Sequence, residues 1–310
     1  NSLNMPRHIS LLFPGQGSQS IGMLNDFDDS KINPIRKISN NLFDFDLIDV
    51  INNGPDDLIN RTSITQPALL ATSFLYFKKF LALSQTLPNI FAGHSLGEYS
   101  ALVAAESISM EDAMSIVHKR GLFMESCPKG AMYAILNFDL DSINKICNKV
   151  SLELNDVVSA ANINSENQVV IAGSLEAAKK VADDCKNAGA KRCIQLNVSV
   201  ASHCNLMEEA SKQLSSELDK FMFKAPKFPI IHNIDAKFEN NPINIPKKLE
   251  KQLTSPVQWV KTMKYLHNKD GIVIECGPGK VLSGLAKANG LDNILSMSSE
   301  NFEENFRELI

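Results

Sequence analysis

One serine in this chain has neighbours that suit nucleophilic chemistry. Gly93-His94-Ser95-Leu96-Gly97 matches the G-x-S-x-G pattern, in which a serine occupies a tight turn between a strand and a helix. The two glycines leave room for the turn, and the N-terminus of the following helix favours negative charge. The N–H of Leu96 would face an oxyanion formed there. The pattern predicts Ser95 as a nucleophile, and a merely structural turn is the alternative.

A serine nucleophile needs a base, and His203 is the candidate. It lies in Val200-Ala201-Ser202-His203-Cys204, where a helical segment is predicted to begin, and it follows Ser95 in the chain as the base does in α/β hydrolases. A helix-capping histidine is the alternative. Because no acidic residue stands in an obvious strand-end loop between the two, we expect a Ser–His dyad oriented by an amide or carbonyl oxygen. Cys204 is expected to be a bystander thiol.

An arginine falls on the apolar face of a predicted helix. The helix begins after Ser109, with Asp112 three residues on, as in a capping motif. Ile116 and Met124 belong to its apolar face, and Arg120 shares that face. A buried arginine needs a partner. Either it pairs with a buried carboxylate of the protein, or its guanidinium captures a substrate carboxylate through two hydrogen bonds.

A glycine-containing loop follows the first predicted strand, at Phe13-Pro14-Gly15-Gln16-Gly17-Ser18-Gln19. It differs from a dinucleotide-binding fingerprint, because Ser20 stands at the third glycine position, and it lacks the Gly-Lys-Ser/Thr of a phosphate-binding P-loop. A flexible loop beside the nucleophile can supply a second N–H to an oxyanion. We assign that role to Gln16.

Alternating strands and helices are predicted to position these residues. Apolar runs at 9–13, 90–92 and 272–274 read as buried strands, and helical patterns follow each of them. Thr65 is expected to cap a helix whose apolar stripe runs from Leu70 to Leu81. This alternation is typical of a parallel sheet covered on both faces. We expect one large α/β domain formed by 1–130 and 199–310.

The middle of the chain follows a different order. Strand patterns at 131–136, 157–163, 168–172 and 192–196 are interleaved with helical patterns at 139–152 and 175–188. The order βαββαβ is that of ferredoxin-like domains. We therefore expect a ferredoxin-like small domain at 131–198, inserted into the large domain.

Composition excludes several classes of function. The 310 residues carry a net charge of -4, which offers no basic field for nucleic acid. No apolar run reaches the roughly 20 residues of a membrane span, and the N-terminus lacks a secretory signal pattern. The six cysteines show neither CxxC pairs nor metal-ligand spacing, so we expect reduced thiols and no metal. A cytoplasmic monomer that binds neither nucleic acid nor membrane is the expectation.

Taken together, these segments resemble the malonyl-CoA:acyl carrier protein transacylases of type II fatty acid synthesis, which are related to polyketide acyltransferase domains. Any one segment is weak evidence, but the ordered set spans nearly the whole chain. The matching segments are Phe13-Pro14-Gly15-Gln16-Gly17-Ser18-Gln19, Thr65-Gln66-Pro67-Ala68-Leu69, Gly93-His94-Ser95-Leu96-Gly97-Glu98-Tyr99-Ser100, Arg120-Gly121 with Met124, Asn162, Gln168-Val169-Val170-Ile171, Ser199-Val200-Ala201-Ser202-His203, Pro256-Val257-Gln258-Trp259 and Glu275-Cys276-Gly277-Pro278-Gly279-Lys280-Val281-Leu282.

The resemblance implies an α/β-hydrolase-like large domain with a ferredoxin-like insert, and a role for each site residue. It implies Ser95 as nucleophile, His203 as base, Arg120 as the ligand of the malonyl carboxylate, the N–H groups of Gln16 and Leu96 as the oxyanion hole, Gln252 as the glutamine whose oxygen orients the histidine, and Gln66, Met124 and Asn162 as residues that line the site. The implied partners are malonyl-CoA and acyl carrier protein. No cofactor is implied, because malonyl-CoA is a substrate and the partner carries the phosphopantetheine.

The implied reaction is ping-pong transfer of malonyl through a malonyl-serine ester. Two other classes of function remain open from the sequence. A serine hydrolase would release the acyl group to water, and a non-catalytic carrier-binding module would leave Ser95 unreactive.

Overall fold

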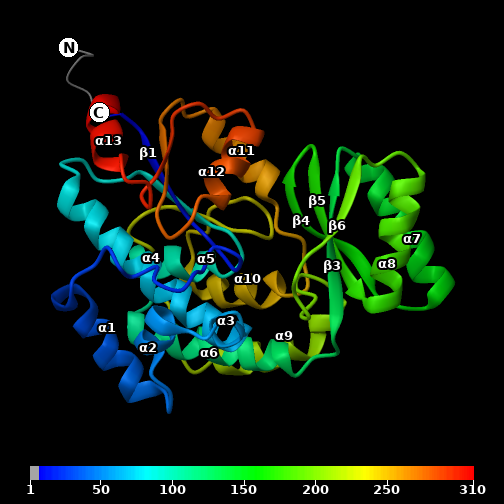
Figure 1. Cartoon of the computed structure of the whole chain (residues 1–310), viewed down its shortest axis with the longest axis horizontal. Helices are drawn as coiled ribbons and strands as arrows, with labels where there is room; N and C mark the ends of the chain where they lie inside the picture. The colour runs from blue at the N-terminus through cyan, green and yellow to red at the C-terminus, as the bar shows by residue number, and fades with distance from the viewer. Residues whose placement is uncertain (1–6) are drawn as a thin grey trace.

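A five-stranded parallel sheet forms the centre of the larger part of the chain (Figure 1). The computed structural model describes residues 7–310. All neighbouring strands of this sheet are parallel, which confirms the predicted α/β fold. In spatial order the strands are β7 (Ile230–Ile231), β2 (Ile90–Gly93), β1 (Ile9–Phe13), β8 (Ile272–Glu275) and β9 (Ile294–Ser296).

Helices cover this sheet, and for that reason every residue of β1 is buried. Within residues 7–310, none of the helices combines the length and apolar character needed to cross a membrane. The helices of this part are α1 (Asp29–Leu42), α2 (Leu47–Asn53), α3 (Asp56–Ile59), α4 (Thr62–Leu83), α5 (Gly97–Ala104), α6 (Met110–Glu125), α9 (Glu208–Leu218), α10 (Ile245–Gln252), α11 (Trp259–His267), α12 (Val281–Ala288) and α13 (Phe302–Leu309), with short 3₁₀ helices at Asn205–Met207 and Pro242–Asn244.

The start of α4 differs from the prediction. Thr65 is not its cap, because the helix already begins at Thr62 and the Thr65 hydroxyl donates to the carbonyl of Ile59 at 2.6 Å. The helix is buried around most of its circumference, so packing rather than an apolar stripe sets its extent. Pro67 has no N–H to offer the carbonyl of Ser63, and His118 Nδ1 bonds that carbonyl instead at 2.8 Å.

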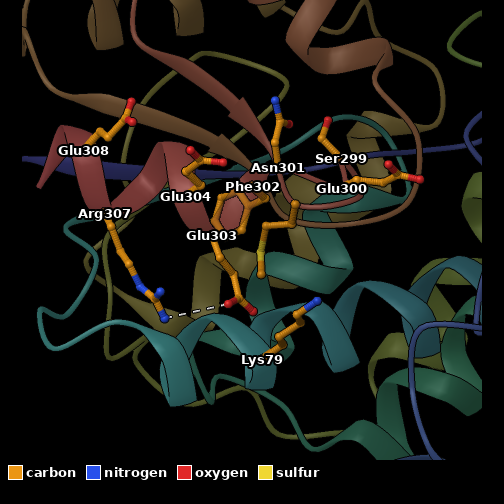
Figure 2. Close-up of a pocket in the computed structure, with 10 residues that line it drawn as sticks. Lys79, Ser299, Glu300, Asn301, Phe302, Glu303, Glu304, Arg307 and Glu308 are labelled. Atoms are coloured by element: carbon orange, nitrogen blue, oxygen red, sulfur yellow. Dashed lines mark ion pairs between the residues drawn. The ribbon is translucent and has the colours of Figure 1, made fainter.

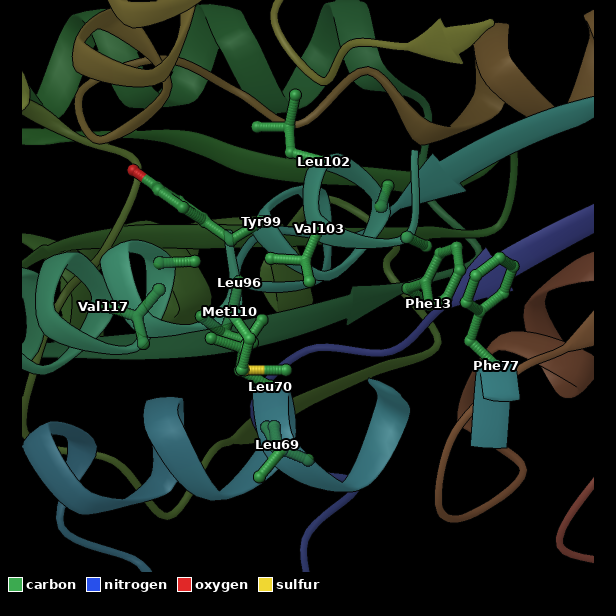
Figure 3. Packing of buried hydrophobic residues seen from close by; sticks show 14 of the residues in the cluster. Phe13, Leu69, Leu70, Phe77, Leu96, Tyr99, Leu102, Val103, Met110 and Val117 are labelled. Atoms are coloured by element: carbon green, nitrogen blue, oxygen red, sulfur yellow. The ribbon is translucent and has the colours of Figure 1, made fainter. Parts of the chain in front are cut away.

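The main hydrophobic core lies between β1, α4, α5 and α6 (Figure 3). Phe13 of β1 packs edge-on against Phe91 of β2, with ring centroids 5.5 Å apart, and Phe77 of α4 contacts both rings. All eight residues of α5 are buried, including Tyr99 and Leu102. Because α5 follows Ser95 directly, the turn that carries the serine is anchored in a close-packed interior.

A four-stranded antiparallel sheet forms the second part of the chain, with strand order β4-β5-β3-β6. Helices α7 and α8 cover its outer face, at the right of Figure 1. Each strand lies within two residues of its predicted bounds. The elements are β3 (Gly130–Leu136), α7 (Leu140–Leu154), β4 (Val158–Ser165), β5 (Gln168–Ser174), α8 (Leu175–Asn187) and β6 (Arg192–Gln195).

Backbone and side-chain hydrogen bonds join β4 to the larger part of the chain. The N–H of Val257 donates to the carbonyl of Ala161 at 2.8 Å, and the N–H of Ile163 donates to the carbonyl of Val257 at 3.0 Å. Asn289, just after α12, donates its side-chain N–H to the carbonyl of Asn164 at 2.8 Å. These bonds fix β4 beside the segment that precedes α11 and the C-terminal end of α12.

Candidate active site

Ser95 lies just beyond the carboxyl end of β2, on the predicted turn into α5. Its φ is +54°, in the left-handed region that non-glycine residues rarely adopt. The flanking glycines are required, because a Cβ on Gly93 would meet the backbone of Gly97, and a Cβ on Gly97 would meet the carbonyl of Phe13. The turn thus packs backbone against backbone on β1, which holds Ser95 in its strained conformation.

His203 faces the serine, as predicted. Its Nε2 lies 2.8 Å from Ser95 Oγ, and its Nδ1 lies 2.7 Å from the backbone carbonyl of Gln252. A carbonyl oxygen can only accept, so Nδ1 carries the proton and Nε2 is left to accept one from the serine. The group that orients His203 is a carbonyl oxygen rather than a carboxylate. This agrees with the expectation from the sequence, in which no acidic residue stands in a suitable loop.

The protonation of His203 follows from its burial. The side chain is 1% exposed, and desolvation lowers the pKa of the imidazole to about 3, a shift that the nearby positive charge of Arg120 reinforces. The imidazole is therefore neutral near pH 7 and free to accept a proton. Cys204, the next residue, is buried, and burial raises the pKa of its thiol to about 11, as expected of a bystander.

Arg120 projects from α6, whose first turn is capped by Ser109 through the N–H of Asp112. Its guanidinium is buried and donates to two amide oxygens, Gln66 Oε1 at 2.8 Å and Gln252 Oε1 at 2.9 Å. Within residues 7–310 it forms no ion pair with a carboxylate, and its Nε has no hydrogen-bond partner. The alternative of an ion pair with a buried carboxylate of the protein is therefore wrong.

A cleft of about 410 Å³ brings most of the predicted site residues together. The two remaining predicted residues, Gln66 and Gln252, lie behind its wall and hold the guanidinium of Arg120. Asn162 reaches the cleft from β4, and its buried Oδ1 has no partner among the described residues. The predicted residues in the lining are Gln16, Ser95, Leu96, Arg120, Met124, Asn162 and His203, joined by Met132, Leu196, Val198 and Val200.

The two N–H groups predicted to form an oxyanion hole follow neighbouring strands, β1 and β2. Within residues 7–310, the backbone N–H of neither Gln16 nor Leu96 has a hydrogen-bond acceptor in the protein. The side chain of Gln16 is turned aside, because its Oε1 accepts from the Thr62 hydroxyl at 2.9 Å. The loop that carries Gln16 packs closely against the turn that carries Ser95. Gly15 makes this possible, because a Cβ at that position would meet the backbone carbonyl of His94.

Asn233, Glu98 and Asn164 were not predicted as residues of the site. Asn233 follows β7 and accepts the N–H of Ser95 at 2.8 Å, and buried Glu98 accepts the N–H of Asn233 at 2.7 Å. His94 Nε2 bonds Asn164 Oδ1 at 2.8 Å, so the histidine points away from the serine hydroxyl. The only sequence signal for Asn233 was a polar residue after a short apolar pair, which is too common to single it out.

A second hollow, of about 530 Å³, lies at the C-terminal helix α13 (Figure 2). Its lining includes the carboxylates of Glu300, Glu304 and Glu308, and an exposed ion pair joins Glu303 to Arg307 at 3.8 Å. The excess negative charge of these carboxylates disfavours binding of an anionic substrate in this hollow. Within residues 7–310, no group of three His, Cys, Asp or Glu side chains lies close enough together to hold a metal.

The chain is similar to known acyltransferases over almost its whole length. The acyl transferase domain family matches residues 11–299. A malonyl CoA-acyl carrier protein transacylase of Haemophilus influenzae is 42% identical over 289 residues, which cover 91% of this chain and 92% of that protein. The enzyme of the same name from Escherichia coli K12 is 44% identical over 285 residues, covering 90% and 91%.

Solved structures agree with the sequence relatives. The malonyl CoA-acyl carrier protein transacylase of Coxiella burnetii superposes with a TM-score of 0.92 at 36% identity, covering 98% of each chain. A malonyl-transacylase in complex with a type II polyketide synthase acyl-carrier protein superposes with a TM-score of 0.90 at 37% identity, covering 97% of this chain and 99% of that one. The chain therefore belongs to the acyl transferase domain family, among the malonyl CoA-acyl carrier protein transacylases.

Proposed function

We propose that this chain transfers the malonyl group from malonyl-CoA to the phosphopantetheine thiol of an acyl carrier protein, for fatty acid biosynthesis. The names of its relatives and the carrier complex of one of them support this substrate and this partner. The reaction needs no cofactor, because both thiols belong to the substrates.

In the first half-reaction, Ser95 Oγ attacks the thioester carbonyl of malonyl-CoA and its proton passes to His203 Nε2. The N–H groups of Gln16 and Leu96 stabilise the oxyanion of the tetrahedral intermediate. When the carbon–sulfur bond breaks, the imidazolium returns the proton to the CoA thiolate, and a malonyl-serine ester remains. The 2.8 Å contact between Ser95 Oγ and His203 Nε2 supports this step.

In the second half-reaction, the carrier thiol attacks the malonyl-serine ester. His203 takes the thiol proton and gives it to the departing Ser95 oxygen, so the free enzyme is regenerated and the kinetics are ping-pong. The backbone carbonyl of Gln252 accepts a hydrogen bond from the Nδ1–H of His203 throughout and keeps the ring in one orientation.

The buried guanidinium of Arg120 in the same cleft as Ser95 and His203 is the observation that favours malonyl over other acyl groups. Its charge meets only the neutral amide oxygens of Gln66 and Gln252 among its described hydrogen-bond partners. A malonyl carboxylate would supply the missing negative charge, whereas an acetyl group would leave the buried charge uncompensated. The lining residues Met124 and Asn162 complete the pocket for the acyl group.

The test is the intact mass of the protein after brief mixing with malonyl-CoA. We expect a malonyl adduct on the wild type that acyl carrier protein removes, no adduct on the Ser95→Ala variant, and little adduct with acetyl-CoA. Steady release of CoA without an adduct would indicate a hydrolase instead. Absence of both would contradict any covalent role of Ser95.

We further propose that 131–198 is a ferredoxin-like domain inserted into an α/β-hydrolase-like domain formed by 1–130 and 199–310. The strand order β4-β5-β3-β6 and the βαββαβ succession support this assignment. We also propose that the protein acts as a monomer in the cytoplasm, where CoA thioesters and carrier proteins would meet it.

A further inference from the structure

We infer that Asn233 is a positioning residue for the nucleophile, and that buried Glu98 holds Asn233 in place. The inference rests on the proposed function, since it concerns the reactivity of Ser95. Asn233 follows β7, the neighbour of β2, and its side chain is buried and absent from the lining of the cleft. It can therefore act on the reaction only through the residues that it touches.

The side-chain amide of Asn233 makes three hydrogen bonds around the turn. Its Oδ1 accepts the N–H of Ser95 at 2.8 Å, and its Nδ2 donates to the carbonyl of Gly93 at 2.6 Å. Gln252 Nε2 donates to the same Oδ1 at 3.1 Å. A reversed amide would place its NH₂ group against two other donors, so these partners admit only one orientation.

These bonds fix the direction of an N–H group that Asn233 does not touch. Gln252 Nε2 donates to the carbonyl of Ser95 at 2.9 Å, on the side of the turn that Asn233 occupies. In a trans peptide the C=O and the following N–H point in opposite directions. The N–H of Leu96 is therefore turned away from Gln252 and toward the cleft. Asn233 accepts a hydrogen bond from the N–H of Ser95 and another from Gln252 Nε2. It thereby keeps the peptide between Ser95 and Leu96 oriented with the N–H of Leu96 toward the cleft.

The main chain of Asn233 is itself held on both sides. Its N–H donates to Glu98 Oε1 at 2.7 Å, and its carbonyl accepts the N–H of Gln258 at 2.9 Å. The other oxygen of Glu98 contacts His232 Nδ1 at 3.2 Å. Glu98 stands in the first turn of α5, so the helix that begins at the nucleophile also carries the group that holds Asn233.

The test compares Asn233→Ala with a control that loses a hydrogen bond of the same kind. In the control, Asn89→Ala, the lost bond joins Asn89 Oδ1 to the N–H of Ile9 at 2.8 Å, at the opposite end of β1. The probe is a fluorophosphonate: Ser95 Oγ bonds to phosphorus, fluoride leaves and the serine proton goes to His203. For folded Asn233→Ala, we expect the phosphonylation rate constant and kcat to fall roughly 10- to 100-fold, with KM within about twofold.

Several outcomes would overturn the inference. The inference is contradicted if folded Asn233→Ala is phosphonylated as fast as Asn89→Ala. It is also contradicted if KM of Asn233→Ala rises by the same factor by which kcat falls. If Asn233→Ala does not fold, the isosteric Asn233→Asp decides. Its second oxygen cannot donate to the carbonyl of Gly93, so a wild-type rate would contradict the inference. A wild type that reacts with the fluorophosphonate but takes no malonyl would contradict the proposed function alone.

Discussion

Gln252 joins three parts of the site through different atoms of one residue. Its backbone carbonyl orients His203, its side-chain oxygen accepts from Arg120, and its side-chain nitrogen donates to the carbonyl of Ser95. The predicted nucleophile, base and carboxylate ligand therefore share one rigid support. Any displacement of α10, which ends at Gln252, would disturb all three together.

Replacing Arg120 tests whether its charge selects the acyl group. Arg120→Ala should lower kcat/KM for malonyl-CoA by roughly 10²- to 10³-fold, because a buried carboxylate would then lack its partner. The same change should lower acetyl loading by less than about tenfold, since acetyl makes no ion pair. The measurement is single-turnover loading of both thioesters, with Lys119→Ala as the control, because Lys119 pairs with Glu217 at 2.9 Å and does not line the cleft. Equal losses for both substrates would contradict the assignment.

The low pKa of His203 leads to a distinctive pH profile. Because burial keeps its pKa at about 3 rather than 6.5, the base stays neutral on acidification. We expect kcat/KM for malonyl-CoA to change by less than about twofold between about pH 8 and about pH 5. The unfolded chain binds a proton at this histidine near pH 6.5, so the stability that it contributes declines as pH falls from 6.5 toward 3. A kinetic inflection near pH 6.5 would show that the base is solvated.

Among the elements, the turn from β2 to α5 tolerates the least change. Gly97→Ala would force a Cβ against the carbonyl of Phe13, so we expect the free energy of unfolding to fall by about 2 kcal/mol or more, with loss of Ser95 reactivity. Gly284→Ala in α12 is the matched control, since a Cβ there has nothing within 4 Å. It should raise stability by about 0.5 to 1 kcal/mol. Thermal and urea unfolding of both variants would measure this, and equal effects would contradict the steric argument.

Local signals in the sequence predicted some elements well and others poorly. The strand 9–13 and the Ser109 cap were predicted correctly, because each depends on adjacent residues. The start of α4 was not predicted correctly, because a helix that is buried on most sides has no polar face from which its ends could be read. β7 has only two residues, too few for any periodicity, and Asn233 was missed with it. Its contact with Ser95 spans 138 positions of the chain and exists only once β7 lies beside β2.

At the level of the whole molecule, the cleft lies where the two sheets meet. Ser95 follows β2 of the parallel sheet, Arg120 projects from α6, and His203 lies in the loop that leads from β6 to the 3₁₀ helix Asn205–Met207, whereas the antiparallel sheet contributes Met132 and Asn162 to the wall. The residues predicted to react therefore lie outside the antiparallel sheet, whose residues shape the wall of the cleft. Loosening the contact between the sheets should therefore change substrate binding more than the rate of the chemical step.

Asn164 offers a way to test this division. Its Oδ1 accepts from His94 across the contact between the two sheets, and its Nδ2 donates to Gln168 within the antiparallel sheet. Asn164→Ala removes both bonds, and loss of the bond to His94 should weaken the contact between the two parts by about 1 to 3 kcal/mol. KM for malonyl-CoA should rise severalfold while kcat falls by less than about threefold, and amide exchange in β4 should accelerate.

The matched control is Asn167→Ala, in the exposed turn of the same hairpin. Because the Asn167 side chain is exposed, its loss should leave KM, kcat and exchange in β4 as in the wild type. If Asn164→Ala lowers kcat and leaves KM unchanged, the antiparallel sheet acts on the chemical step through His94, and the separation of chemistry from shape is wrong. If both variants leave exchange in β4 unchanged, the backbone bonds at Val257 and the Asn289 bond to the carbonyl of Asn164 suffice to hold the two parts together.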